Sequence, residues 1–234
     1  MPERGEKMSR TPQTKGPCVY CGKLMTSGGM AKHLGTCPQR LVQLDTSDGK
    51  AGTVQRLYHL LVRDRYSKQF WLHLEMNGSA KLKDLDVYLR AIWLECCGHM
   101  SKLTAKGWGT ADIPSSWTAQ RAFDVHPELI HLYDFGTTSE TVIRVVGSRE
   151  GKPLTRHPIV LMARNDMPEA TCMECDARAT HFCQECTIER DETGLLCAKC
   201  VEDHPCHNYG EPIPLVNSPR LGMCGYDGPA TPPY

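Results

Sequence analysis

Residues 57–76 read LYHLLVRDRYSKQFWLHLEM, two runs of alternating apolar and polar side chains joined by a polar segment. An alternation of period two is typical of a strand with one buried face. The polar residues 63–68 between the two runs suit the turn of a hairpin. The stretch therefore predicts an antiparallel strand pair that buries Tyr58, Leu60, Val62, Phe70, Leu72, Leu74 and Met76.

A helix is expected directly after this hairpin, over about residues 82–94. Leu85, Leu89, Ile92 and Trp93 recur at the spacing of one helical face. The segment Cys96-Cys97-Gly98 is expected to end the helix. Further strands are predicted in 130–146, around a Gly136-Thr137-Thr138 turn, and in 158–163. Strands followed by a helix and more strands predict an α+β domain with a small central sheet over residues 52–165.

Residues 16–40 carry the first of two metal-binding patterns, Cys18-x-x-Cys21 followed by His33 and Cys37. A two-residue gap lets both sulfurs face one Zn²⁺ ion. His33 and Cys37 are four residues apart, so we expect them on one face of a helix. A hairpin with two thiolates and a helix with the other two ligands is the ββα finger layout.

Residues 168–210 carry the second pattern, three Cys-x-x-Cys pairs followed by a cluster of His and Cys. In a cross-brace, alternate pairs combine around one ion. One site would then be Cys172, Cys175, Cys197 and Cys200, and the other Cys183, Cys186, His204 and His207, with Cys206 as the alternative to His207. In a sequential pairing, the first pair would instead join the second. The order and spacing of residues 172–207 resemble the B-box, a cross-brace module used for protein–protein contact.

Four protein ligands close a zinc site, whereas a catalytic zinc keeps a position for water. We therefore predict three structural zinc ions and no catalytic zinc. Of the 13 cysteines, three fall outside these two ligand patterns, and a fourth, Cys206, is an alternative ligand. Cys96 and Cys97 are expected to be buried free thiols, and Cys224 an exposed thiol.

The two ends of the chain differ in charge, although the formal net charge is zero. Residues 1–44 contain seven Lys and Arg against two acids, and residues 166–210 contain ten acids against three Lys and Arg. Residues 1–15 are expected to be a disordered tail, and the Pro- and Gly-rich residues 211–234 to lack regular structure. No apolar run is long enough to span a membrane and no apolar leader is visible, which predicts a cytoplasmic protein.

The central segment resembles the plasmid ORF-3-like family, whose members are sometimes labelled transposon-passenger proteins. The resemblance lies in residues 57–76, in KLKDLDVYLRAIWLECCGHMSKL (81–103) and in HLYDFGTTSETVIRVV (131–146). Its motifs are the helix start at 82–85, Gly98-His99, and Tyr133-Asp134-Phe135-Gly136. With its zinc modules, the whole chain is similar to a subgroup of uncharacterised bacterial and archaeal proteins. The resemblance implies a small α+β domain and no particular chemistry.

The sequence shows no phosphate-binding loop, nucleophile elbow or other catalytic constellation. We predict a non-enzymatic, zinc-stabilised interaction protein that binds a protein partner. The alternative is a nucleic-acid-associated factor linked to mobile elements, with Lys23, Lys32 and Arg40 on the finger as phosphate contacts. A pocket that gathered His59, His73, His99 and Asp134 would instead favour an enzyme.

Overall fold

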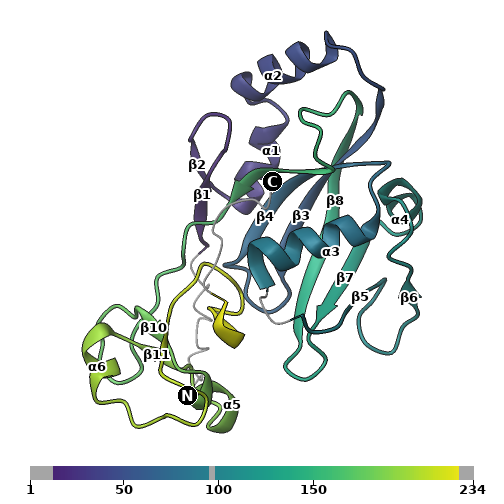
Figure 1. Ribbon diagram of the computed structural model, residues 1–234. Helices are drawn as coiled ribbons and strands as arrows, with labels where there is room; N and C mark the ends of the chain where they lie inside the picture. The colour runs from purple at the N-terminus through teal and green to yellow at the C-terminus, as the bar shows by residue number, and fades with distance from the viewer. Residues whose placement is uncertain (1–12, 95–97, 227–234) are drawn as a thin grey trace, which may run out of the picture.

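The computed structural model describes residues 13–94 and 98–226, and its centre is a seven-stranded antiparallel sheet (Figure 1). The strand order is β6-β5-β7-β8-β3-β4-β9. The helix α3, Leu82–Leu89, crosses one face of this sheet, and α4, Ala119–Val125, lies beyond its N-terminal end. The strands are β3 Gln55–Asp64, β4 Trp71–Asn77, β5 Ser101–Thr104, β6 Asp112–Ile113, β7 Glu128–Tyr133, β8 Ser139–Gly151 and β9 Ile159–Arg164. The predicted α+β fold with Cys/His clusters near both ends is confirmed.

The hairpin of β3 and β4 lies inside this sheet, between β8 and the edge strand β9, with Leu60 opposite Leu74 and Val62 opposite Leu72. These four side chains are fully buried under α3. The predicted helix stripe is also buried, and the helix continues through a π-helical turn at Arg90–Leu94. Asp84 stabilises the start of the helix, because its carboxylate accepts the backbone N–H of Lys81 at 2.8 Å. The expectations for Cys96 and Cys97 fall outside the described residues.

Strand β4 is buried on both faces, which the alternating pattern does not predict. Trp71, His73 and Glu75 point away from α3, and yet each is 3% exposed or less. The cover on this second face comes from the N-terminal module. The sheet is therefore a middle layer between α3 and the predicted zinc finger (Figure 1).

The N-terminal module has the predicted ββα order and one further helix. Its elements are β1 Lys15–Pro17, β2 Leu24–Thr26, α1 Ser27–Leu34 and α2 Pro38–Asp48. Helix α2 extends to Asp48, well beyond residue 40, where the first metal-binding pattern was expected to end. The module also joins the edge of the sheet, where Val19 donates its N–H to the carbonyl of Met162 at 2.9 Å. Only glycine fits at position 16, because a Cβ there would lie 1.8 Å from the carbonyl oxygen of Arg164.

The C-terminal module is built from short elements around a three-stranded sheet in the order β11-β10-β12. These elements are β10 His181–Phe182, α5 Gln184–Glu189, β11 Leu195–Leu196, α6 Ala198–Glu202 and β12 Ile213–Pro214. In Figure 1 this module lies beside the finger side of the sheet, away from α4.

The segment 215–226, which we call the C-terminal strap, has little regular secondary structure, but it is packed against the central domain. Arg220 is 4% exposed and pairs with Asp134 at 2.9 Å. The Tyr226 hydroxyl donates to the carbonyl of Ala91 at 2.7 Å, and Ser218 Oγ donates to the carbonyl of Trp93. These contacts hold the strap against the end of the α3 segment. The strap ends in a short 3-10 helix at Met223–Gly225.

Candidate metal centres

Four side chains of the N-terminal module meet at one point between the hairpin and the sheet. Cys18 and Cys21 come from the β1–β2 turn, His33 from α1, and Cys37 from the start of α2. Their ligand atoms all lie within 4.8 Å of one another, with Cys18 Sγ 4.0 Å from Cys37 Sγ and Cys21 Sγ 3.2 Å from His33 Nε2. Ligands of a tetrahedral zinc ion are separated by about 3.5–3.8 Å. The group has the spacing that a zinc ion requires.

The chain reaches Cys37 by a different route from the one predicted. Helix α1 ends at Leu34, and Cys37 is the N-cap of α2 rather than a residue on the helix of His33. Pro38 occupies the first helical position, where its missing N–H costs no hydrogen bond, so a new helix begins there. The ligand group forms across a helix junction instead of along one helical face.

The C-terminal module gathers two further groups, and their pairing is the cross-brace. The first group contains Cys172, Cys175, Cys197 and Cys200. Cys175 Sγ lies 3.7 Å from Cys197 Sγ and 3.6 Å from Cys200 Sγ. Cys197 also caps α6, because its sulfur accepts the N–H of Cys200 at 3.4 Å. The first Cys-x-x-Cys pair thus joins the third, so the alternative in which it joins the second does not describe this structure.

The second C-terminal group contains Cys183, Cys186, His204 and Cys206, all buried. Cys186 Sγ lies 3.3 Å from His204 Nε2 and 3.6 Å from Cys206 Sγ. Cys183 caps α5 by accepting the N–H of Cys186 at 3.5 Å. The pairs that begin at Cys183 and Cys197 are therefore positioned by the first turns of α5 and α6.

His207, which we predicted as a ligand, lies outside this group. Its side chain is 64% exposed and its Nδ1 lies 3.1 Å from a carboxylate oxygen of Glu211. Cys206 is 1% exposed and takes the fourth place beside Cys186. Alternation explains the exchange, since neighbouring residues in an extended segment point to opposite sides. His204 and Cys206 share a side, and His207 faces solvent.

The environment of the thiols differs between the groups. Burial raises the pKa of Cys18 to about 11, although nearby backbone N–H groups oppose the shift. Burial also acts on Cys172, but hydrogen bonds from backbone N–H groups outweigh it and lower the pKa of this thiol to about 6. Metal binding requires thiolates, so a zinc ion at either place displaces protons.

His59 and His73 form a pair between the sheet and the finger, in which His73 is buried and His59 is half-buried. His73 Nε2 lies 3.0 Å from the carbonyl of Ser27, so this nitrogen donates, and His73 Nδ1 accepts from His59 Nε2 at 2.8 Å. Burial lowers the pKa of His59 to about 3, with a contribution from His73, and the pKa of His73 to about 4. Both rings are neutral near pH 7. They link the sheet to the start of α1.

His99 and Asp134 lie elsewhere, beside the C-terminal strap. His99 Nδ1 is 3.7 Å from Asp134 Oδ2. Together with Cys224 of the strap, these residues form a group of one imidazole, one carboxylate and one thiol. The four residues that would have favoured an enzyme are thus divided between two places. Sequence reasoning missed the role of Cys224 in this group, because no local pattern connects a Pro- and Gly-rich tail with a turn 90 residues earlier.

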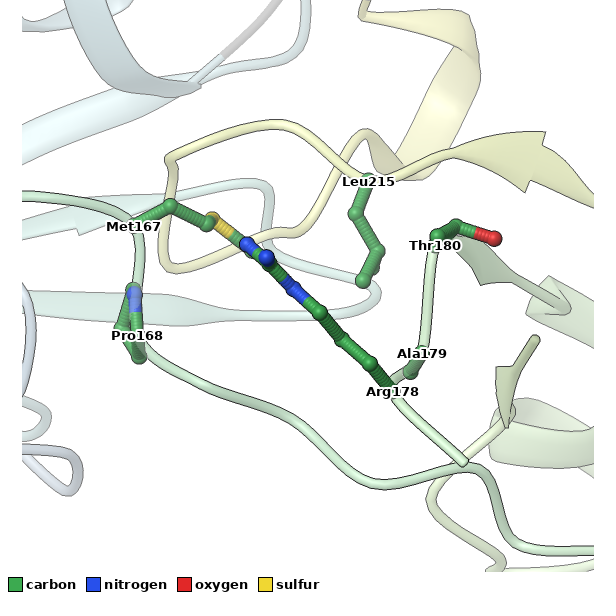
Figure 2. A pocket seen from close by; sticks show the side chains of 6 residues that line it. All are labelled: Met167, Pro168, Arg178, Ala179, Thr180 and Leu215. Atoms are coloured by element: carbon green, nitrogen blue, oxygen red, sulfur yellow. The ribbon is translucent and has the colours of Figure 1, made fainter. Parts of the chain in front are cut away.

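A hollow of about 280 Å³ lies where the C-terminal module joins the central domain (Figure 2). Figure 2 shows the Arg178 side chain extended across it toward Met167. The remaining lining residues are Pro168, Ala179, Thr180 and Leu215. The lining holds one charged group and no carboxylate, imidazole or thiol, so it offers no metal ligands and no acid–base pair.

Comparison with known proteins extends this description little. No family model matches the chain, and no curated protein matches it. One matching solved structure is a protein of unknown function, MM3350, from Methanosarcina mazei Go1, with 15% sequence identity and a TM-score of 0.41. The match covers 48% of this chain and 70% of that one. Among the described residues, no helix combines the length and hydropathy needed to cross a bilayer.

The chain is thus a mixed α and β protein, and its described residues include three groups of four Cys or His, one near the N-terminus and two near the C-terminus, that could hold metal ions.

Proposed function

We propose that the protein is a zinc-stabilised interaction protein without catalytic zinc, and that its C-terminal module binds a protein partner. The observation that carries the proposal is the presence of three groups of four Cys or His donors, each compact enough for one ion. The ligands would be Cys18, Cys21, His33 and Cys37; Cys172, Cys175, Cys197 and Cys200; and Cys183, Cys186, His204 and Cys206.

Four protein donors leave no position for a reacting water molecule, which is the arrangement of structural zinc. All three groups are rich in sulfur, the ligand type that favours zinc over magnesium or calcium. Zinc in such sites contributes directly to the free energy of folding. The metal would therefore stabilise the folded structure of the two modules, and their surfaces would be available to bind a partner.

The surface of the C-terminal module suits a basic protein. Of the ten acids in residues 166–210, nine are exposed, and only Glu185 is buried. Ile188 and Tyr209 are exposed apolar side chains within this acidic surface, at 42% and 45%. The Tyr209 hydroxyl donates to Glu189 at 2.6 Å, so the aromatic ring lies next to the end of α5. Exposed aromatic and apolar groups with complementary charge around them are features of protein interfaces.

The nucleic-acid alternative loses one of its predicted phosphate contacts. Arg40 is buried, and its guanidinium pairs with Glu75 at 2.7 Å instead of facing solvent. Lys23 and Lys32 remain exposed. The apolar helix face of the finger packs against the sheet, which leaves the finger little area for contact with a duplex. We therefore favour the protein partner. Kinship with the plasmid ORF-3-like family also remains a proposal, supported by the sequence motifs alone.

The test is cross-linking mass spectrometry of the full chain expressed in its host. We expect cross-links from a protein partner to fall in 185–211, and the double variant Glu189→Lys, Glu192→Lys to lose them. The matched control, Lys23→Glu with Lys32→Glu, should keep them. The proposal fails if the acidic variant retains its partner while the control loses bound nucleic acid and binding falls steeply with salt.

A further inference from the structure

Three side chains from distant parts of the chain converge at the end of β7. His99 precedes β5, Asp134 follows β7, and Cys224 belongs to the C-terminal strap. Their potential ligand atoms all lie within 4.8 Å of one another, and His99 Nδ1 is 3.7 Å from Asp134 Oδ2. This distance falls within the 3.2–4.0 Å found between donors of the three Cys/His groups. The group therefore has the spacing of ligands around one ion.

Arg220 and two backbone amides donate hydrogen bonds to members of this group. Arg220 donates to Asp134 Oδ2 at 2.9 Å and lies 3.7 Å from Cys224 Sγ. The same guanidinium is anchored by the carbonyl of Thr137 at 2.9 Å and the hydroxyl of Ser139 at 3.0 Å. The other oxygen of Asp134 accepts the N–H groups of Gly136 and Thr137. Such outer partners orient ligating carboxylates and thiolates in metal sites.

These contacts also fix the charge of the carboxylate. Burial would raise the pKa of Asp134, but the hydrogen bonds from Arg220 and the two amides outweigh it and hold the pKa below its usual range. The carboxylate is therefore ionised and ready to bind a cation at neutral pH.

The backbone at two of the three positions is in a conformation that non-glycine residues rarely adopt. Asp134 has φ of 62° and Cys224 has φ of 63°. Residues in the left-handed region persist where surrounding contacts hold them, and they concentrate at functional sites. The strain aims both side chains at one point from opposite segments.

We propose that His99, Asp134 and Cys224 form a fourth zinc site, of a different class from the other three. Among the described residues, these three side chains supply one nitrogen, one oxygen and one sulfur, and the fourth position is left for water or another ligand. The His99 side chain is 42% exposed, so solvent reaches the site. Zinc with three protein ligands and an exchangeable fourth is the arrangement that activates water.

This site binds zinc more weakly than the sulfur-rich groups. It has two anionic ligands, and the positive charge of Arg220 lies close to the metal position. A competing chelator should therefore empty it first, which allows it to be tested while the other sites stay filled.

The test is native mass spectrometry of the zinc-saturated full chain during a titration with a chelator. We expect four zinc ions, with the first released well before the other three. His99→Ala should hold three from the start, because this partly exposed ring can be removed without opening the buried network. The control His126→Ala, a partly exposed histidine outside all four groups, should hold four. A wild-type chain that never exceeds three, or a His99→Ala chain that holds four, overturns the proposal.

Cobalt(II) added to the singly emptied protein gives a second, independent readout. We expect a thiolate-to-cobalt absorption band that Cys224→Ser abolishes and that added azide shifts by entering the exchangeable position. A band unaffected by Cys224→Ser would show that the ion binds elsewhere. A band insensitive to azide would contradict the exchangeable position. If the three sulfur-rich groups bound no zinc, the proposed function would be contradicted. The His99 site would still be tested by its cobalt absorption band.

Discussion

The two ends of the molecule have the same kinds of metal ligand, but their modules have different hydrophobic cores. The N-terminal module packs Met30 and Leu34, both fully buried, against Trp71 and Met162 of the sheet. In the C-terminal cluster, five of the six buried residues are cysteines of the predicted metal groups, and the sixth is Leu196. Metal therefore supplements an apolar core at one end, whereas at the other end it takes the place of one.

This contrast predicts that removing metal has its largest effect on the C-terminal module. Structural zinc contributes an apparent binding free energy of about 10–16 kcal/mol in small fingers. With excess chelator, amides in 172–206 should lose their protection from hydrogen exchange, while those of α1 and β9 keep part of theirs. Equal loss of protection at both ends would contradict the contrast. Mass spectrometry of exchanged peptides measures both regions in one sample.

The N-terminal module is also held to the sheet by a buried charge network, which gives the next largest effect. Glu75 is 3% exposed and pairs with Arg40 at 2.7 Å and with Arg149 at 2.8 Å. Glu75→Gln leaves the buried Arg40 and the half-buried Arg149 without their counter-charge, a loss of about 3–5 kcal/mol in the free energy of unfolding. Denaturant unfolding measures it. Glu150→Gln breaks an exposed pair with Arg56 and should cost at most about 1 kcal/mol. Similar costs for the two variants would refute the buried network.

A cavity in the finger core should destabilise the central sheet as well as the finger. Leu34→Ala is expected to lower the free energy of unfolding by about 2–5 kcal/mol, because its side chain is fully buried beside Trp71. Leu41→Ala is the control, since Leu41 is 46% exposed on the next helix. Tryptophan fluorescence and far-ultraviolet circular dichroism should report one shared transition. A finger that unfolds alone, before the sheet, would count against a common core.

The pair of His59 and His73 makes the finger–sheet contact sensitive to acid. The pKa of His73 is about 4 in the folded protein and about 6.5 in an unfolded chain. The unfolded state thus binds more protons between these values, and stability falls as the pH falls through this window. Between about pH 6.5 and 5, His73 should account for about 2 kcal/mol.

His73→Gln tests this pH dependence, because an amide can donate to Ser27 and accept from His59 without titrating. Denaturant unfolding at pH 7 and pH 5, with zinc in excess, should show the smaller loss in the variant. Protonation of the zinc ligands affects both proteins alike and cancels in the difference. Parallel pH profiles would show that His73 does not contribute.

The smallest effect is expected for a substitution of His207, and a substitution of its neighbour Cys206 is the comparison. His207→Ala should leave the number of bound zinc ions and the thermal midpoint unchanged, because His207 is exposed beside Glu211. Cys206→Ser should lose one zinc ion. The reverse result would restore His207 as the ligand. Zinc counts for the two purified variants decide the point.

Local patterns in the sequence predicted the parts of the fold that local physics determines. The alternation in 57–76 gave the central hairpin, the stripe from Leu85 to Trp93 gave α3, and the Cys-x-x-Cys spacings indicated the metal groups. The second buried face of β4 was not predictable in this way. In the sequence, His73 and Glu75 have the pattern of solvent-facing residues. Their partners, Ser27 and Arg40, come from another module and are evident only in the tertiary structure.

The C-terminal strap illustrates the same limit. Its Pro and Gly content correctly excludes long helices and strands, but a composition says nothing about docking. Arg220 finds Asp134 only through the tertiary fold, and this pair places Cys224 beside His99. The choice between Cys206 and His207 also depends on which side of an extended segment faces inward, and ligand spacing alone allows both.

The central claim is that sulfur-rich groups of four protein ligands close around zinc at both ends of the chain. Zinc K-edge X-ray absorption on the His99→Ala variant, with its three remaining ions, tests it most directly. The ligand sets contain ten cysteine sulfurs and two imidazole nitrogens. The account predicts a first shell dominated by sulfur at about 2.3 Å, with a minor nitrogen component at about 2.0–2.1 Å. A first shell made mostly of oxygen and nitrogen, or fewer than four ligands contributed by protein per ion, would contradict it.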